Sequence, residues 1–122
     1  MPPVSRIAAT RAATIEIARL MADTKCVNVR ILDVSGISPV CDFLVLGTGT
    51  SARQMKTVAD DVAEWGKEHD LRSFGSAGTG ENWIALDLVD VVVHVFSQEG
   101  RQYYDLDNLW GDATDVAWKR DA

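Results

Sequence analysis

The second half of the chain contains two runs of mainly apolar, strand-forming residues with few charged residues. Trp83–Asp87 and Asp90–Phe96 flank the dipeptide Leu88-Val89, which predicts a β-hairpin with a tight turn. Because successive strand residues point to opposite faces, the second run is apolar on both faces. These faces are formed by Val91, Val93 and Val95, and by Val92, His94 and Phe96. A strand of this kind is usually covered twice, by helices on one side and by helices or a partner protein on the other.

Two segments nearer the N-terminus also predict strands. Cys26–Val34 alternates apolar and polar residues. The apolar face of this strand is expected to hold Val27, Val29 and Ile31. Asp42–Gly47 contains four consecutive apolar residues, a pattern typical of a buried central strand.

Helical spacing of apolar residues marks two longer segments. Ser5 can cap the first, which continues to about Ala22. Ser51 can cap the second, and Gln54 completes a capping box in which each side chain satisfies the other residue's free backbone N–H. The apolar stripe of this second helix consists of Met55, Val58, Ala59, Val62, Trp65 and Gly66. Its opposite, solvated face is expected to carry Lys56, Asp60, Glu64 and Lys67.

The residues after the hairpin predict two short helical turns. Ser97 can cap a helix that ends at about Tyr104, and Asp105 can cap a second turn. From Gly111 onward the sequence has no periodicity. Trp118, within this last segment, is either docked on the domain or part of a loose end.

The order of these elements determines the expected fold class. Leu71–Phe74 adds a short strand ahead of the glycine-rich loop Gly75–Gly80. A strand–helix–strand crossover normally makes a parallel pair and a hairpin makes an antiparallel one, so the sheet should be mixed. We expect a single α/β (α+β) domain over residues 1–122, with a five-stranded mixed sheet and flanking helices. Its structured core is expected at about 5–111, followed by a tail over 112–122.

The composition narrows the class of protein. The 122 residues, 47% hydrophobic and 25% charged, are in the range of a soluble globular domain with a core of its own. No apolar run approaches the roughly 20 residues that span a bilayer, and the N-terminus lacks the apolar block of a signal peptide. We therefore expect a cytoplasmic protein that does not act at a membrane.

The net charge of −6 is unevenly distributed along the chain. Residues 1–25 carry four basic and two acidic groups, whereas residues 81–122 carry three basic and nine acidic groups. Nucleic-acid affinity rests on Lys and Arg that neutralise phosphates, so the acidic second half argues against direct binding of RNA or DNA. It favours a basic protein partner through charge complementarity.

Several features could support chemistry, and each has a simpler interpretation. Gly47–Ser51 could hold a phosphate on its backbone N–H groups. This possibility leaves a nucleotide-binding or nucleotidyltransferase-type enzyme as an alternative function. The simpler interpretation is a tight turn closed by the capping box. A lone His94 on an apolar strand is more often a hydrogen-bonded core or interface residue than a catalytic base. Four aspartates could bind magnesium, but each of them also fits a position in a turn or at the cap of a helix. These are Asp87, Asp90, Asp105 and Asp107.

The two cysteines also give little support to metal or redox chemistry. Cys26 and Cys41 have neither CxxC spacing nor a histidine close by in the sequence. We expect two reduced, half-buried structural residues, and we expect no catalytic residue, cofactor or metal in this chain.

Aromatic residues gather in the C-terminal half and favour a binding surface. They are Trp83, Phe96, Tyr103, Tyr104 and Trp110, some of which must belong to the core. Trp83 opens a strand after a glycine loop and is the best candidate for an exposed anchor, rimmed by Leu86, Asp87 and Asp90. A plainer alternative is a dimerisation module whose two-sided strand pairs only with itself.

Four segments together carry a specific pattern. They are Val29–Val34, Asp42–Gln54, Trp83–Phe96 and Tyr103–Trp110, and the match spans about residues 10–111. The most specific part is the string Asp-Val-Val-Val-His-Val-Phe followed by Tyr-Asp-Leu and Leu-Trp. In these segments the chain resembles the ribosomal silencing factors, also called the Iojap-related proteins.

The resemblance implies a non-enzymatic translation repressor with a nucleotidyltransferase-like fold that has lost the catalytic acids. Such a protein binds the large ribosomal subunit through its ribosomal protein number fourteen and sterically prevents the small subunit from joining, typically when nutrients are scarce. Homodimers are known in the family. Carried onto this sequence, the expected contact residues are Trp83, Leu86, Asp87, Asp90, Val92, His94 and Tyr104.

The sequence departs from the family pattern at two places. Val89 stands where the family usually has Gly in the hairpin turn, which disfavours a turn with positive φ at that position. Gln98-Glu-Gly100 replaces the usual Pro-Glu pair, which predicts a looser start of the following helix.

Overall fold

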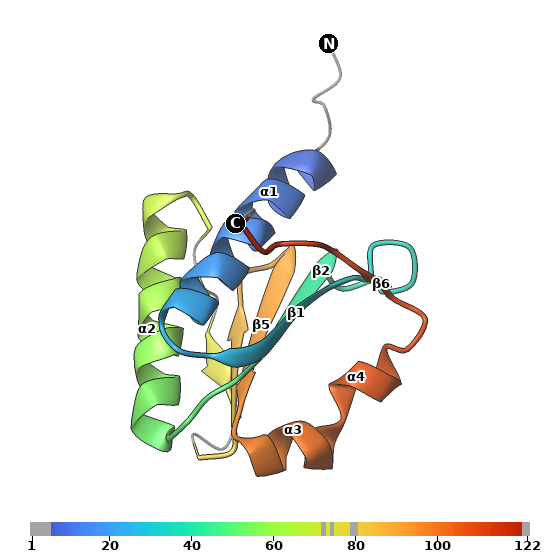
Figure 1. Cartoon of the computed structure of the whole chain (residues 1–122). Helices are drawn as coiled ribbons and strands as arrows, with labels where there is room; N and C mark the ends of the chain where they lie inside the picture. Colours follow the sequence, from blue (N-terminus) through green and yellow to red (C-terminus); the bar gives the residue numbers. More distant parts are fainter. Residues whose placement is uncertain (1–5, 72, 74, 79–80, 121–122) are drawn as a thin grey trace.

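The computed structural model describes residues 6–71, 73, 75–78 and 81–120, whose strands form one mixed sheet in the order β3-β4-β5-β2-β1-β6 (Figure 1). The elements are α1 (Arg6–Asp23), β1 (Val27–Asp33), β2 (Phe43–Thr48), α2 (Ala52–Glu68), β3 (Ser76–Ala77), β4 (Trp83–Asp87), β5 (Val91–Phe96), α3 (Gln98–Tyr104), α4 (Leu106–Leu109) and β6 (Thr114–Asp115). The expected single α+β domain with a mixed sheet and flanking helices is confirmed. The sheet has six strands instead of the expected five.

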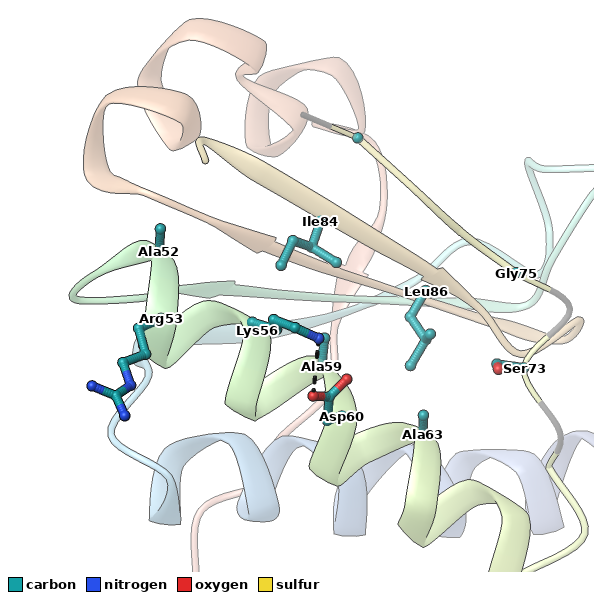
Figure 2. Close-up of a pocket in the computed structure, with 11 residues that line it drawn as sticks. Ala52, Arg53, Lys56, Ala59, Asp60, Ala63, Ser73, Gly75, Ile84 and Leu86 are labelled. Atoms are coloured by element: carbon teal, nitrogen blue, oxygen red, sulfur yellow. Dashed lines mark hydrogen bonds and ion pairs between the residues drawn. The ribbon is translucent and has the colours of Figure 1, made fainter. Parts of the chain in front are cut away.

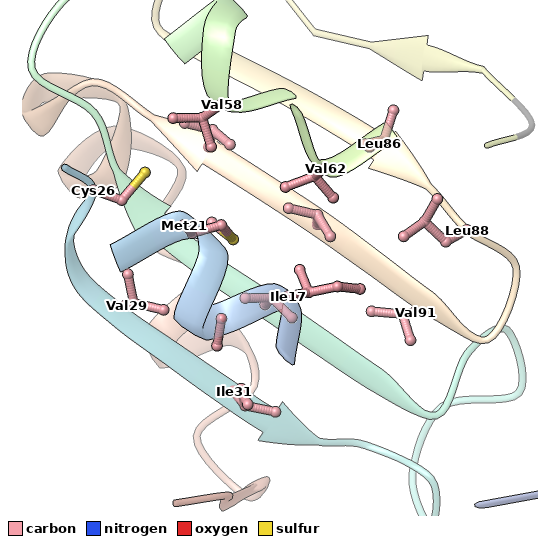
Figure 3. Packing of buried hydrophobic residues seen from close by; sticks show 14 of the residues in the cluster. Ile17, Met21, Cys26, Val29, Ile31, Val58, Val62, Leu86, Leu88 and Val91 are labelled. Carbon is pink, nitrogen blue, oxygen red and sulfur yellow. The ribbon is translucent and has the colours of Figure 1, made fainter. Parts of the chain in front are cut away.

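The sheet is covered differently on its two faces. The long helices α1 and α2 pack on one face, and the short helices α3 and α4 lie against the other (Figure 1). Figure 3 shows Ile17 and Met21 of α1 and Val58 and Val62 of α2 packed over the strands. The predicted apolar stripe of α2 is confirmed, since its members are buried except for a half-buried Trp65.

The two central strands confirm the strongest expectations from the apolar pattern. Each of the six residues of β2 is buried, and β2 runs parallel to β5. β4 and β5 form the predicted antiparallel hairpin, whose turn is closed by Leu88 N–H donating to the Val91 carbonyl at 2.8 Å. Val89 in this turn has a φ of 72°, so the turn keeps the left-handed conformation although a β-branched residue occupies it.

β1 departs from the predicted alternation at its first residues. Val27 pairs with Thr48 and Arg30 pairs with Leu46, so two β1 residues oppose the single Gly47 and form a β-bulge. Asn28 within the bulge has a φ of 51°. The extra residue inverts the alternation, so the prediction that Val27 shares the buried face of Val29 and Ile31 is wrong: Val27 is 50% exposed.

The third strand lies later in the chain than predicted. It is the two-residue β3, which pairs with β4, whereas Leu71 and Ser73 are not in a strand. The other two residues of the predicted strand, Arg72 and Phe74, lie outside the described residues.

The C-terminal segment is docked on the sheet, which answers the question that the sequence left open for Trp118. β6 pairs with the outer edge of β1, and the Trp118 indole N–H donates to the Val29 carbonyl at 3.1 Å. Arg19 donates to the Trp118 carbonyl at 2.7 Å. Arg120 adds an ion pair with Asp23 at 3.0 Å.

Two of the predicted caps, Ser51 and Ser97, are found, and the side-chain cap predicted at Asp105 is not. Ser51 accepts from the Gln54 backbone N–H at 3.0 Å, but the Gln54 side chain accepts from Thr50 rather than from Ser51. Ser97 caps α3 by accepting from the Gly100 N–H at 2.9 Å, so this helix starts in good order without the family's proline. Asp105 precedes α4 in a left-handed conformation but makes no side-chain cap bond, and Ser5 lies outside the described residues.

Candidate functional site

Four aromatic rings lie together on the face of the sheet opposite α1 and α2. We call this group the aromatic platform; it consists of Trp83, His94, Phe96 and Tyr104. The hairpin register places Trp83 directly opposite Phe96, and strand alternation places His94 on the same face. Tyr104 reaches the platform from the last residue of α3. One hairpin and one short helix therefore supply all four rings.

The rings are held in nearly parallel and tilted contacts. The planes of Trp83 and His94 differ by 18° with centroids 5.9 Å apart, and Tyr104 lies 4.8 Å from Trp83 at a tilt of 41°. The Trp83 indole N–H also donates a hydrogen bond to His94 Nδ1 at 3.0 Å. Phe96 is fully buried beneath the group, whereas Trp83 and Tyr104 are half-buried. The platform thus has a rigid base and two aromatic side chains that remain partly open to solvent.

His94 is neutral at physiological pH. Its side chain is only 9% exposed, and burial lowers its pKa from 6.5 to about 4. An imidazole with so low a pKa and no carboxylate partner is a poor general base or acid near neutral pH. The structure therefore agrees with the interpretation of His94 as a hydrogen-bonded residue of the core or of an interface.

Acidic side chains lie at the other end of the same hairpin. Asp87 is exposed and pairs across the strands with the half-buried Val92. One Asp87 carboxylate oxygen accepts from the Val89 N–H at 2.8 Å, which confirms the turn role expected for this residue. Asp90, which is half-buried, lies 4.0 Å from the exposed Arg6 guanidinium. The hairpin therefore carries aromatic rings at one end of this face and the Asp87 carboxylate at the other, with Asp90 in the turn beside it.

Leu86 does not belong to this surface. It pairs with Val93 on the opposite face of the hairpin and is 5% exposed within the core beneath α2. Alternation requires this result, because residues 83, 85 and 87 point to one side of the strand and residues 84 and 86 to the other. Of the seven predicted contact residues, Trp83, Asp87, Val92, His94 and Tyr104 share one face, Asp90 lies in the turn and Leu86 is excluded.

Tyr103 belongs to this region but is not among the seven predicted contact residues. Tyr103 is 82% exposed and packs edge-on against Tyr104, with ring centroids 5.0 Å apart. Two consecutive tyrosines in a short helix point in different directions, so one of the pair facing solvent could have been anticipated. Tyr103 extends the aromatic surface beyond the platform.

The turn at Gly47–Ser51 uses its backbone donors within the protein. The Gly49 N–H donates to the Phe96 carbonyl at 2.7 Å, and the Thr50 N–H donates to the Gln54 side chain at 3.0 Å. A Cβ added at Gly49 would collide with Met55 and Gln54, so close packing explains this glycine. These contacts support the interpretation of the segment as a tight turn rather than as a phosphate cradle.

Asp107 and Asp105 are engaged in structural contacts. The Asp107 carboxylate binds Arg101 at 2.8 Å and Arg30 at 2.7 Å, and the hydrogen bond from Arg101 is the main cause that lowers its pKa to about 2. Asp105 accepts from the Asn108 side chain at 2.8 Å. Among the described residues, no three His, Cys, Asp or Glu side chains gather in a way that could hold a metal ion.

The two cysteines are free and more deeply buried than the half-buried state that we expected. Burial raises the pKa of the Cys26 thiol to about 11 and also raises the pKa of Cys41. Both are therefore protonated thiols at neutral pH, and neither is activated as a nucleophile.

A groove of about 750 Å³ lies elsewhere, between α2 and β4 (Figure 2). Ile84 and Leu86 of β4 point towards Ala59 and Ala63 of α2, and an ion pair of 3.3 Å between Lys56 and Asp60 lies along its rim. The groove is separated from the platform by the thickness of the sheet. In the described part of the chain, no helix has both the length and the apolar character needed to cross a bilayer.

Comparison with known proteins gives consistent relatives. The sequence profile of the family described as "Ribosomal silencing factor during starvation" matches residues 7–122. The chain is 37% identical over 92 residues to the ribosomal silencing factor RsfS of Bacillus subtilis (strain 168), which covers 75% of this chain and 78% of that protein. It is 28% identical over 103 residues to the chloroplastic protein Iojap of Zea mays, covering 84% of this chain and 45% of that protein.

Solved structures give the same result at the level of the fold. A crystal structure of a Chromobacterium violaceum protein superimposes with a TM-score of 0.77 and 31% identity, covering 91% of this chain and 92% of that chain. A protein of Bacillus halodurans superimposes with a TM-score of 0.73 and 30% identity, covering 87% of this chain and 98% of that chain.

Proposed function

Because the chain belongs to the family of ribosomal silencing factors, we propose that it binds the large ribosomal subunit through ribosomal protein number fourteen and blocks association with the small subunit. The result of this steric block is repression of translation. The proposed site of action is the cytoplasm. The protein acts by occupying a surface and not by catalysis.

The aromatic platform is the observation that carries this proposal. Half-buried Trp and Tyr side chains supply large apolar contact area at a low cost in conformational entropy, and such residues dominate the energy of many protein interfaces. Trp83 and Tyr104 are held in place by Phe96 beneath them, so little ordering is needed when a partner binds.

The acidic end of the hairpin supports a basic protein as the partner. Asp87 is exposed next to Val92 and lies on the same face as the platform. A carboxylate at the rim of an apolar contact attracts Lys or Arg of a partner and sets the orientation of binding. The proposed contact residues are therefore Trp83, Asp87, Asp90, Val92, His94 and Tyr104.

Sucrose-gradient sedimentation of purified subunits tests the proposal. Large and small subunits are mixed under joining conditions with and without the protein, and we expect the joined peak to fall while the protein travels with the large subunit. Asp87→Lys should lose this effect, and far-UV circular dichroism checks that it stays folded, because the exposed Asp87 also accepts the turn hydrogen bond from the Val89 N–H. Asp61→Lys is the matched control, since Asp61 is exposed on α2 on the other side of the sheet.

Unchanged joining in the presence of the wild-type protein would contradict the proposal as a whole. Equal activity of Asp87→Lys and Asp61→Lys would contradict only the proposed surface. A homodimer that covers the same platform in the absence of ribosomes is a second proposal, favoured by the apolar rings that the monomer leaves half-open. Light scattering of the free protein should then show a doubled mass that Trp83→Ala reduces.

A further inference from the structure

The hydrogen bond between Trp83 and His94 determines where the imidazole carries its proton. An indole N–H can only donate, so His94 Nδ1, at 3.0 Å from it, must accept. A neutral imidazole has one donor and one acceptor nitrogen. His94 therefore carries its hydrogen on Nε2, and this assignment follows from the partner's chemistry alone.

The Nε2–H group has no partner within the described chain. Among the hydrogen bonds of these residues, His94 makes only the one with Trp83. Nε2 is also not among the fully buried polar side-chain atoms that lack a partner in the described residues. It follows that Nε2–H reaches solvent at the surface of the platform, through the small exposed fraction of a side chain that is otherwise buried.

The surroundings of this donor are apolar. Ala85 lies directly across from His94 on β4 and Leu46 lies beside it on β2, while the rings of Trp83 and Phe96 flank it on the same face. A partner that covers this region excludes solvent from the donor. Leaving a buried N–H without an acceptor is costly, so the partner must supply an acceptor of its own.

We propose that the platform presents one fixed hydrogen-bond donor, His94 Nε2–H, and that the ribosomal protein places a carbonyl oxygen over it. The inference rests on the proposed function and states which partner surfaces can bind. A surface that places only apolar atoms or another N–H group over His94 Nε2 binds more weakly, because the His94 donor then has no acceptor. Trp83 is then a positioning residue as well as an anchor, because its indole N–H holds His94 in the donor tautomer.

Two substitutions separate the roles of the two ring nitrogens. In His94→Gln the amide group falls near the position of Nε2 and retains a donor towards the partner. In His94→Asn the amide falls near Nδ1, retains an acceptor for Trp83 and loses the outward donor. We expect large-subunit binding to be weakened by roughly tenfold or more in His94→Asn and by clearly less in His94→Gln. Far-UV circular dichroism checks that both variants are folded.

Nitrogen NMR of the imidazole in the free wild-type protein gives an independent measurement. We expect the spectrum of a neutral ring protonated at Nε2, and a mixture of tautomers in Trp83→Phe, which keeps a ring at this position but removes the indole donor. Two results would overturn the inference: a ring protonated at Nδ1, or binding of His94→Asn to large subunits as tight as that of His94→Gln. The proposed function would still stand if the wild type bound large subunits. If the wild type does not bind large subunits, the proposed function is wrong, and so is the proposed carbonyl acceptor on the ribosomal protein. The NMR result still shows whether His94 carries its hydrogen on Nε2.

Discussion

His94 gives the chain a predictable sensitivity to acid. Burial holds its pKa at about 4 in the folded protein, whereas the unfolded chain titrates near 6.5. Between these values the unfolded state binds more protons, so this residue's contribution to the free energy of unfolding is complete above about pH 6.5 and is lost as the pH falls towards 4. The largest contribution expected from the gap between the two values is about 3 kcal/mol.

Urea unfolding of the wild type and of His94→Gln at several pH values in this window measures the effect. The variant should lose less stability than the wild type as the medium is acidified, because it has no imidazole to protonate. His69→Gln is the matched control, since His69 is exposed at the end of α2. Parallel losses in the wild type and in His94→Gln would show that His94 is not held neutral by burial.

Val89 occupies a backbone conformation that a β-branched residue adopts at a cost. Its φ is 72°, and its side chain is 49% exposed, so it gains little from packing. Val89→Gly should raise the free energy of unfolding by about 1 kcal/mol, measured by urea unfolding. Val27→Gly is the matched control: Val27 is 50% exposed without positive φ, and the same change there should lower stability. A loss of stability in both variants would contradict the strain at Val89.

At the scale of elements, Asp107 joins α4 to α3 and to β1. It binds the guanidinium groups of Arg101 and Arg30, and Arg101 also donates to the Asn28 carbonyl at the bulge of β1 at 3.0 Å. The Arg101 side chain is 13% exposed, so a lost partner is only partly replaced by water. Asp107→Asn should therefore lower the free energy of unfolding by about 2 kcal/mol.

The measurement is again urea unfolding, with Asp60→Asn as the control. Asp60 pairs with Lys56 across one turn of α2, with both side chains exposed, and pairs of that kind contribute about 0.5 kcal/mol or less. Comparable effects of the two substitutions would show that the partial burial of Arg101 does not matter and that α3 and α4 are held by packing alone.

The elements that could be predicted from the sequence are those whose pattern is local. The hairpin and α2 each follow from periodicity and caps within about 15 residues, and both are confirmed. The bulge of β1 could not be read in this way, because it depends on the positive φ of Asn28 and on the register with β2. β6 is two residues long and forms because β1 offers an unpaired edge and Arg30 binds Asp115. Such elements depend on contacts far along the chain.

At the scale of the whole molecule, the candidate site could be predicted in its composition but not in its layout. The aromatic and acidic residues of the hairpin are evident in the sequence, and alternation assigns them to two faces. It does not say which face the helices cover. The structure decides this: α1 and α2 bury the side of Leu86, and the short α3 leaves Trp83 and Tyr104 half-open on the other side.

The acidic second half of the chain predicts how binding responds to salt. Attraction between exposed charges speeds the encounter of two proteins and is screened as ionic strength rises. With the proposed partner, isolated ribosomal protein number fourteen, stopped-flow association should slow several-fold from about 50 mM to about 300 mM salt, with little change in dissociation.

Asp87→Lys separates a local effect from the effect of net charge. Placed at the rim of the proposed surface, this change should slow association at low salt and flatten its salt dependence. Asp61→Lys raises the net charge by the same amount on exposed α2, away from the platform, and should retain most of the wild-type slope. If both variants changed the salt dependence of association equally, electrostatic steering would depend on the total charge of −6 and not on the acidic end of the hairpin. The partner's basic side chains would then not be opposite Asp87.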